Sequence, residues 1–167
     1  MTSEEILECI PVRRRIPLRS PYYCALFLTS KRMIVAALID SSLSAASYYN
    51  WRPVKRIGAI LSKLQPEQIL EDYEGNLEIS YSDVTKVKMS HWAATTFGKM
   101  NLRVHRIEIL TKKKRLKFNI CARSNEILER YVPVLKSVLG DRFDHNPEMV
   151  KLRFYSFGVL ARELFDR

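Results

Sequence analysis

The sequence lacks the short motifs that mark the common enzyme classes. It contains no G-x-G-x-x-G, no P-loop, no G-x-S-x-G and no H-E-x-x-H. Its three histidines, His91, His105 and His145, stand far apart in the sequence, and we expect each at a surface or turn position. Nothing in the chain points to catalysis, so we expect a protein that is not an enzyme.

Cysteine is scarce as well. Cys9, Cys24 and Cys121 stand singly and form no C-x-x-C pair, so we expect no zinc site and no disulfide framework. Reduced, buried thiols are the prediction, with a Cys9–Cys24 disulfide left open if their strands are neighbours. The acidic residues between 67 and 83 do not have the spacing of a calcium loop. We therefore expect neither a metal nor another cofactor.

Long hydrophobic runs are absent. The longest, 33–39, is far too short to span a bilayer, so no transmembrane segment is expected. The first ten residues are acidic where a signal peptide would be basic, and no Asn-x-Ser/Thr acceptor occurs. We expect a cytoplasmic protein that associates with membranes only peripherally. Glutamine occurs only at 65 and 68 in a chain rich in Lys, Arg and Glu, which is in line with a thermophilic source.

Positive charge is what the chain has in excess. The 28 Lys and Arg residues against 18 Asp and Glu give a formal net charge of +10. Such a balance favours contact with an anionic partner, and the alternative is that it only confers solubility. Residues 99–117 hold eight cations against Glu108 alone, a net +7, and four of the cations are consecutive at 112–115. This hairpin is either an electrostatic docking tip or an edge protected from aggregation by its lysines.

Hydrophobic patterning predicts a chain of strands followed by helices. The expected strands are 4–12, 22–28, 33–39, 77–81, 84–89, 102–110 and 115–122. We expect helices at 51–64, 67–72, 125–139 and 147–165, with loops at 41–47 and 90–100. The helix at 51–64 is basic on one side and apolar on the other, which suits either a membrane interface or packing on the sheet. Pro133 should kink the 125–139 helix or force a local adjustment.

Three segments carry a family resemblance. They are 26–35 (LFLTSKRMIV), 77–87 (LEISYSDVTKV) and the hairpin from Ile107 to Phe118. In this order they are similar to the pleckstrin-homology-like (PH-like) superfamily, in its prokaryotic and GRAM-type branch. The resemblance implies an α+β fold, a seven-stranded antiparallel barrel or strongly bent sheet capped by a C-terminal helix. A helical insertion after the third strand and an extra C-terminal helix would be additions to that fold.

The resemblance also implies a division into parts. Residues 1–140 would form the PH-like domain, with 41–76 as the helical insertion and 141–167 as a C-terminal helical extension. Eukaryotic members that bind phosphoinositides use a basic loop between their first two strands. That loop would be 13–21 here, and it lacks their full spacing of Lys and Arg.

We expect a non-catalytic binding or adaptor domain that docks on an anionic membrane surface or an acidic protein through basic loops. The candidate anion-binding residues are Arg13, Arg14, Arg15, Arg19, Arg52, Lys55, Arg56, Lys112, Lys113, Lys114, Arg115 and Lys117. The alternative is a protein-interaction or homo-oligomerisation scaffold acting through the helix at 147–165. Nucleic-acid binding ranks behind both, because 112–117 contains no aromatic residue for base stacking.

Overall fold

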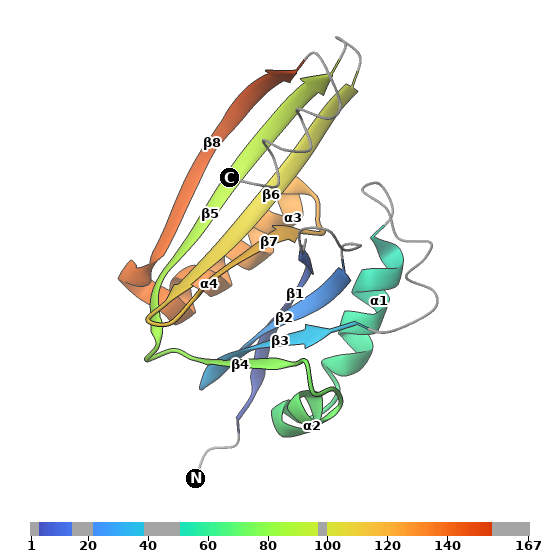
Figure 1. Ribbon diagram of the computed structural model, residues 1–167, viewed down its shortest axis with the longest axis vertical. Coiled ribbons are helices and arrows are strands. Elements are labelled where there is room, and N and C mark those ends of the chain that lie inside the picture. Colours follow the sequence, from blue (N-terminus) through green and yellow to red (C-terminus); the bar gives the residue numbers. More distant parts are fainter. Residues whose placement is uncertain (1–3, 15–21, 39–50, 97–99, 155–167) are drawn as a thin grey trace.

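The computed structural model describes residues 4–14, 22–38, 51–96 and 100–154, and its architecture is α+β (Figure 1). Eight strands form one mixed sheet in the order β4-β3-β2-β1-β7-β6-β5-β8. Their bounds are β1 Ile6–Arg14, β2 Tyr22–Thr29, β3 Arg32–Ala37, β4 Leu77–Ser80, β5 Val84–Thr96, β6 Met100–Thr111, β7 Arg115–Ile120 and β8 Phe143–Phe154. The sheet is open, with β4 and β8 at its edges, so the strand pairing does not close the expected barrel.

Strand β1 joins two antiparallel groups. It pairs with β2 along most of its length. Its pairing with β7 is short and places Val12 opposite Ile120 and Arg13 opposite Asn119. Figure 1 shows β5, β6 and β8 running side by side away from β1–β4. All pairings are antiparallel except that of β8 with β5, which is parallel and makes the sheet mixed.

A helical segment covers one face of the sheet, called here the inner face. It runs through α3 (Ser124–Glu126), the π-helical η2 (Ile127–Tyr131) and α4 (Val132–Leu139). Its buried residues are Ile127, Tyr131, Leu135 and Leu139, and they pack on alternate residues of the strands. The π turn lies just before Pro133, where a normal helix would meet a missing N–H group and a ring clash. This is the local adjustment predicted for that proline.

The outer face of β2 and β3 is covered by α1 (Arg52–Leu61) and α2 (Pro66–Glu71). Val54 and Ile69 from these helices pack on Phe27, Ile34 and neighbouring small residues. The two apolar strands are therefore buried on both faces, as their unbroken hydrophobic runs predict. Val54, Ile57 and Leu61 of α1 pack on the sheet, as the packing alternative predicts, whereas Ile60 and Leu64 of the expected apolar side are exposed.

Two sequence expectations about strands are wrong. Residues 90–100 were expected to form a loop, but β5 continues to Thr96 and β6 begins at Met100. Residues 143–154 form β8, so the predicted helix does not begin at 147 and the sheet has eight strands in place of seven. Val150 and Phe154 fit one face of either a helix or a strand, whereas Leu152 joins them only with a period of two, and the pairing with β5 decides for the strand. Pro147 lies at a register shift on this edge strand, where its missing N–H group costs no ladder bond.

The expected extension at 141–167 can be followed only in part. Residues 143–154 lie in the same sheet as the other strands. Residues 147–154 are therefore strand, and this part of the oligomerisation helix expected at 147–165 does not form. Residues 155–165 lie outside the described part of the chain. Within the described ranges no helix is long and apolar enough to cross a bilayer.

The question of a Cys9–Cys24 disulfide is settled by strand register. Cys9 lies opposite Phe27, and Cys24 lies opposite Val12, three positions further along β1. Because side chains alternate between faces, Cys9 points to the outer face and Cys24 to the inner core. Both thiols are free.

Candidate functional site

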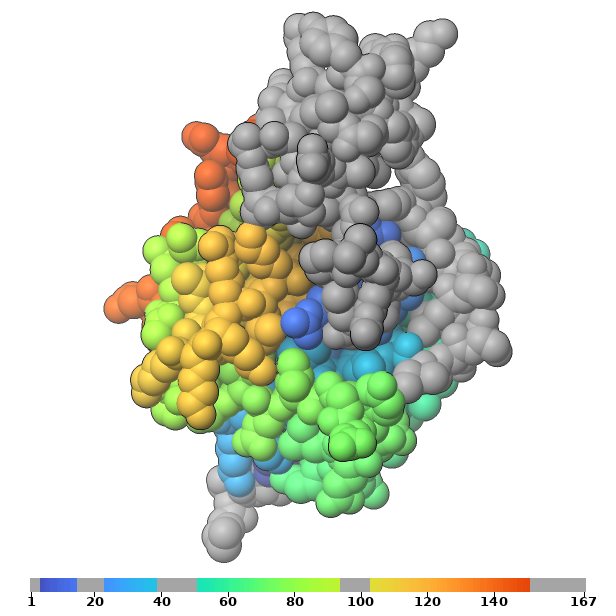
Figure 2. Space-filling view, in the orientation of Figure 1, coloured from blue at the N-terminus to red at the C-terminus, as the bar shows by residue number. Residues whose placement is uncertain are grey.

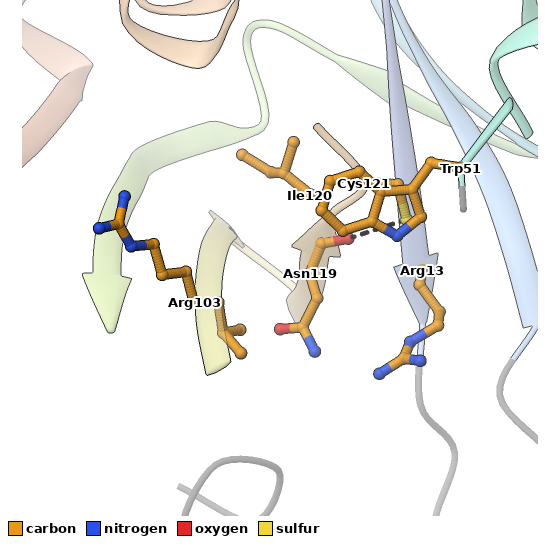
Figure 3. A pocket seen from close by; sticks show the side chains of 7 residues that line it. Arg13, Trp51, Arg103, Asn119, Ile120 and Cys121 are labelled. Carbon is orange, nitrogen blue, oxygen red and sulfur yellow. Dashed lines mark hydrogen bonds between the residues drawn. The ribbon is translucent and has the colours of Figure 1, made fainter. Parts of the chain in front are cut away.

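The predicted cations at the end of β1 lie beside the start of α1. Arg13 is 9% exposed and lies in register with Asn119 of β7, which in turn lies in register with Arg106 of β6. Figure 3 shows the Arg13 and Asn119 side chains pointing the same way, next to Trp51. A small pocket at this point is lined by Arg13, Trp51, Arg103, Val104, Asn119, Ile120 and Cys121. Arg14 is half-buried on β1, while Arg15 and Arg19 lie outside the described residues.

The turn between β6 and β7 presents three exposed lysines, Lys112, Lys113 and Lys114, called here the lysine turn. Thr111 holds its shape: the Oγ1 atom accepts the N–H groups of Lys113 at 3.3 Å and Lys114 at 3.0 Å. The same hydroxyl donates to the carbonyl of Lys114 at 2.9 Å. Lys112 Nζ lies 3.8 Å from Asp83 Oδ1. The turn is therefore a fixed loop that carries three cationic heads into solvent.

The cations of β7 continue from this turn along the outer face. Arg115 forms an ion pair with Glu108, and Lys117 lies opposite Glu108 in the strand register. Partial burial lowers the pKa of Lys117, and the charges of Arg115 and Arg106 lower it further. Burial also lowers the pKa of Arg106, with Arg115 as the second cause. Positive groups are thus crowded on the outer face of β6 and β7 (yellow to orange, exposed in Figure 2).

The three cations of α1 lie on a different element. Arg52 and Arg56 are exposed, whereas Lys55 forms an ion pair with Glu126 of α3. Burial alone would raise the pKa of Glu126, but hydrogen bonds from Lys55 and Tyr131 outweigh it and lower the pKa. Lys55 therefore connects α1 to the helical segment on the inner face. The candidate cations form separate groups on β1, on α1 and on the β6–β7 hairpin.

Sequence reasoning missed a cluster of all three histidines of the chain. His91 of β5 and His105 of β6 lie with their Nδ1 atoms 2.7 Å apart, and His91 Nε2 lies 2.8 Å from His145 Nε2 of β8. At the other end, His105 Nε2 lies 3.1 Å from the Ser124 hydroxyl of α3. The expected surface position is wrong for His91 and His105, which are 4% and 3% exposed.

The surroundings of the histidines disfavour their charged forms. Burial lowers the pKa of His105 to about 4, with the charges of His91 and Arg103 as further causes. Burial also lowers the pKa of His91, helped by His145, and it lowers the pKa of His145. These shifts favour the neutral form of all three imidazoles at pH 7.

The three rings do not form a metal centre. His91 turns Nδ1 toward His105 and the opposite atom, Nε2, toward His145, so the nitrogens follow a line and do not converge on one point. Within the described ranges no group of three or more His, Cys, Asp or Glu side chains could hold a metal ion. What the geometry provides is a hydrogen-bonded row of imidazoles that ends at a serine hydroxyl.

One pattern in the sequence could have predicted the contact between His91 and His105. A hairpin centred on residue 98 pairs position 91 with position 105, as the β5–β6 register does. Because 90–100 was expected to be a loop, the pairing of His91 with His105 was not predicted. His145 reaches the cluster only through the parallel pairing of β8 with β5, for which the sequence carries no local signal.

The comparisons with known proteins are sparse. No protein-family model and no curated protein matches the chain. Among solved structures it is similar to the hSac2 domain from human phosphoinositide phosphatase Sac2, with 10% sequence identity and a TM-score of 0.44. The match covers 93% of this chain and 82% of that chain. A TM-score this low supports no inference about what this protein does.

Proposed function

We propose that this protein is a non-catalytic binding domain of the PH-like type that docks on anionic membrane surfaces through the β6–β7 hairpin. The observation that carries the proposal is the lysine turn. Its three ammonium groups are exposed on a loop fixed by Thr111. In the described part of the chain, Lys113 and Lys114 have no carboxylate at ion-pairing distance, and Lys112 has Asp83 at 3.8 Å.

The order of the strands supports the PH-like part of the proposal. Strands β1–β4 form one antiparallel group and β5–β7 another, β1 pairs with β7, and α4 covers the inner face. Seven antiparallel strands followed by a covering helix is the order that the resemblance of the 26–35 and 77–87 segments implies. Strand β8 is an addition at the free edge of β5.

Simple electrostatics gives the contribution of the three lysines to membrane affinity. A lysine near an anionic leaflet contributes about 1 kcal/mol, so the three lysines together contribute about 3 kcal/mol, roughly 150-fold in affinity. Arg115 and Lys117 follow on β7, where Glu108 offsets one of their two charges, so they add a single net positive charge beside the turn. The attraction decays over a Debye length of about 8 Å at physiological salt, so binding should weaken as salt rises.

The test is co-sedimentation of the full chain with vesicles. One set contains phosphatidylcholine alone, and the other contains phosphatidylcholine with phosphatidylserine, each at low and physiological salt. We expect binding to the anionic vesicles only, weaker at the higher salt. The triple variant K112E/K113E/K114E should lose this binding.

A control variant separates the turn from net charge. Lys31, Lys63 and Lys136 are exposed on other elements, so K31E/K63E/K136E makes the same change in charge elsewhere. The control should keep most of the binding. Equal loss in both triple variants would contradict docking through the turn. No binding of the wild type to anionic vesicles at low salt would contradict membrane docking and would leave the basic hairpin as a feature that confers solubility.

A further inference from the structure

The histidine cluster reaches from the central strands to the edge strand of the sheet. His145 comes from β8, which pairs with β5 and lies at the end of the strand order. Its Nε2 contact with His91 joins the two strands through side chains, and the Phe143 ring stacks on His145 at 6.2 Å between centroids. We propose that His91, His105 and His145 form a proton-responsive latch, which holds β8 on β5 while the imidazoles are neutral and loosens it when they take up protons.

The latch follows from the number of protons that the row can share. A neutral imidazole donates through one nitrogen and accepts through the other, so each N···N contact in the row needs one proton between its two atoms. Neutral rings satisfy both contacts, with His91 donating to one neighbour and accepting from the other. When two adjacent rings are both protonated, two N–H groups face each other at 2.7 or 2.8 Å. The row can therefore take up several protons only by opening.

In the described ranges, no carboxylate contributes to the pKa shifts of the three histidines, so none there balances the added charge. On β6, Arg103 adds positive charge near His105, and no acidic group is among the causes that shift the three pKa values. Asp144 of β8 forms an ion pair with Lys86 of β5 at 2.8 Å. By strand alternation this pair and Lys88 lie on the outer face, opposite the histidines.

The remaining acidic groups near the cluster are engaged or exposed. Glu126 of α3 binds Lys55 and Tyr131, and Glu148 lies exposed in the irregular stretch of β8 after His145. On α3 the group that meets the cluster is the neutral Ser124 hydroxyl. A doubly protonated row would be a partly buried pair of like charges, which is costly inside a protein.

Strand β8 is the element that opening would release. An edge strand with one neighbour separates locally at a lower free energy than a central strand. His145 is half-buried, whereas His91 and His105 are buried, so the row meets solvent at its β8 end. Detaching β8 frees His145 and uncovers His91, and the pKa values of both rise toward the ordinary value of 6.5.

The sign of the pH dependence is fixed by the lowered pKa values. A histidine whose pKa is lower in the closed state favours closure at pH above about 6.5, and this preference is lost as the pH falls. For a histidine that protonates only in the open state, the opening constant rises about tenfold between pH 7.5 and pH 5.5.

Amide hydrogen exchange of the full chain tests the latch. Protection factors, corrected for intrinsic exchange at each pH, are measured for 143–154 and for the central strand β2 at pH 7.5 and 5.5. We expect protection of β8 to fall at least tenfold at pH 5.5, while β2 changes much less. In the double variant H91Q/H145Q this difference between the two pH values should disappear, with circular dichroism at pH 7.5 confirming that the variant folds.

The chain contains no other histidine, so imidazole NMR signals report the cluster directly. We expect all three to titrate below 6.5 and to move together with the loss of β8 protection. Three independent titrations near 6.5, or β8 protection that stays constant between the two pH values, would overturn the proposal. It would also be overturned if one equivalent of zinc shifted all three imidazoles, because the rings would then converge on an ion.

Discussion

The ion pair between Glu8 and Arg130 ties the first strand to the helical segment, and removing its cation should destabilise the fold. Arg130 of η2 donates from Nε to Glu8 Oε2 and from an Nη atom to Oε1, both at 2.7 Å. Glu8 Oε1 also accepts the N–H group of Cys9 at 2.8 Å. The Glu8 side chain is only 7% exposed, so Arg130→Met leaves a buried carboxylate without its cation.

The magnitude follows from the exposure of the two partners. Breaking a fully buried ion pair by removing one partner costs about 3–5 kcal/mol. The Arg130 side chain is 58% exposed, so water reaches the site and screens the remaining charge. We therefore expect Arg130→Met to lower the free energy of unfolding by about 2–3 kcal/mol.

Urea denaturation followed by circular dichroism measures this loss, provided that the m-value is unchanged. The double variant Glu8→Leu/Arg130→Met removes both charges and should recover most of the stability, to within about 1 kcal/mol of the wild type. Lys112→Met is the matched control at an exposed pair 3.8 Å apart and should cost under about 0.5 kcal/mol. The reasoning is refuted if Arg130→Met costs no more than the control, or if the double variant is as unstable as the single one.

Two further predictions concern packing around the cysteines. A Cβ atom on Gly58 of α1 would lie 3.0 Å from Cys9 Sγ, so Gly58→Ala should destabilise by about 1 kcal/mol although alanine favours a helix. In a Cys9→Ala background the same change should be neutral or stabilising in urea denaturation, and equal costs in both backgrounds would contradict the contact. Burial raises the pKa of Cys9 to about 11 and those of Cys24 and Cys121 to about 12. At pH 8 a disulfide reagent should therefore label the native thiols at least a hundredfold more slowly than a free thiol, and labelling at the free-thiol rate would refute their burial.

Local sequence patterns were sufficient for several elements. The β2–β3 hairpin follows from two apolar runs around a polar break, and both strands are buried on two faces as expected. The apolar side of 51–64 predicted which face of α1 packs inward. The lysine turn was expected where the structure has it, because the lysines interrupt two alternating strands.

The patterns failed where a distant strand decides the structure. Residues 90–96 combine polar and small side chains with no clear period, yet they form β5 because β6 and β8 pair with them on both sides. In residues 143–154, Val150 and Phe154 fit a helix or a strand, and Leu152 fits the strand alone. The neighbouring β5, whose paired residues lie 56 to 58 positions earlier in the sequence, decides for the strand.

The sequence by itself thus determined the α+β class, the hairpins, the faces of the covering helices and the positive charge of the β6–β7 turn, because each depends on residues close together in the chain. The tertiary structure alone decided the edge strand β8 and the contact that His145 makes with His91. This contact arises from the register between β5 and β8. Register across a sheet is set by the packing of whole strands, and a single histidine in the sequence carries no trace of it.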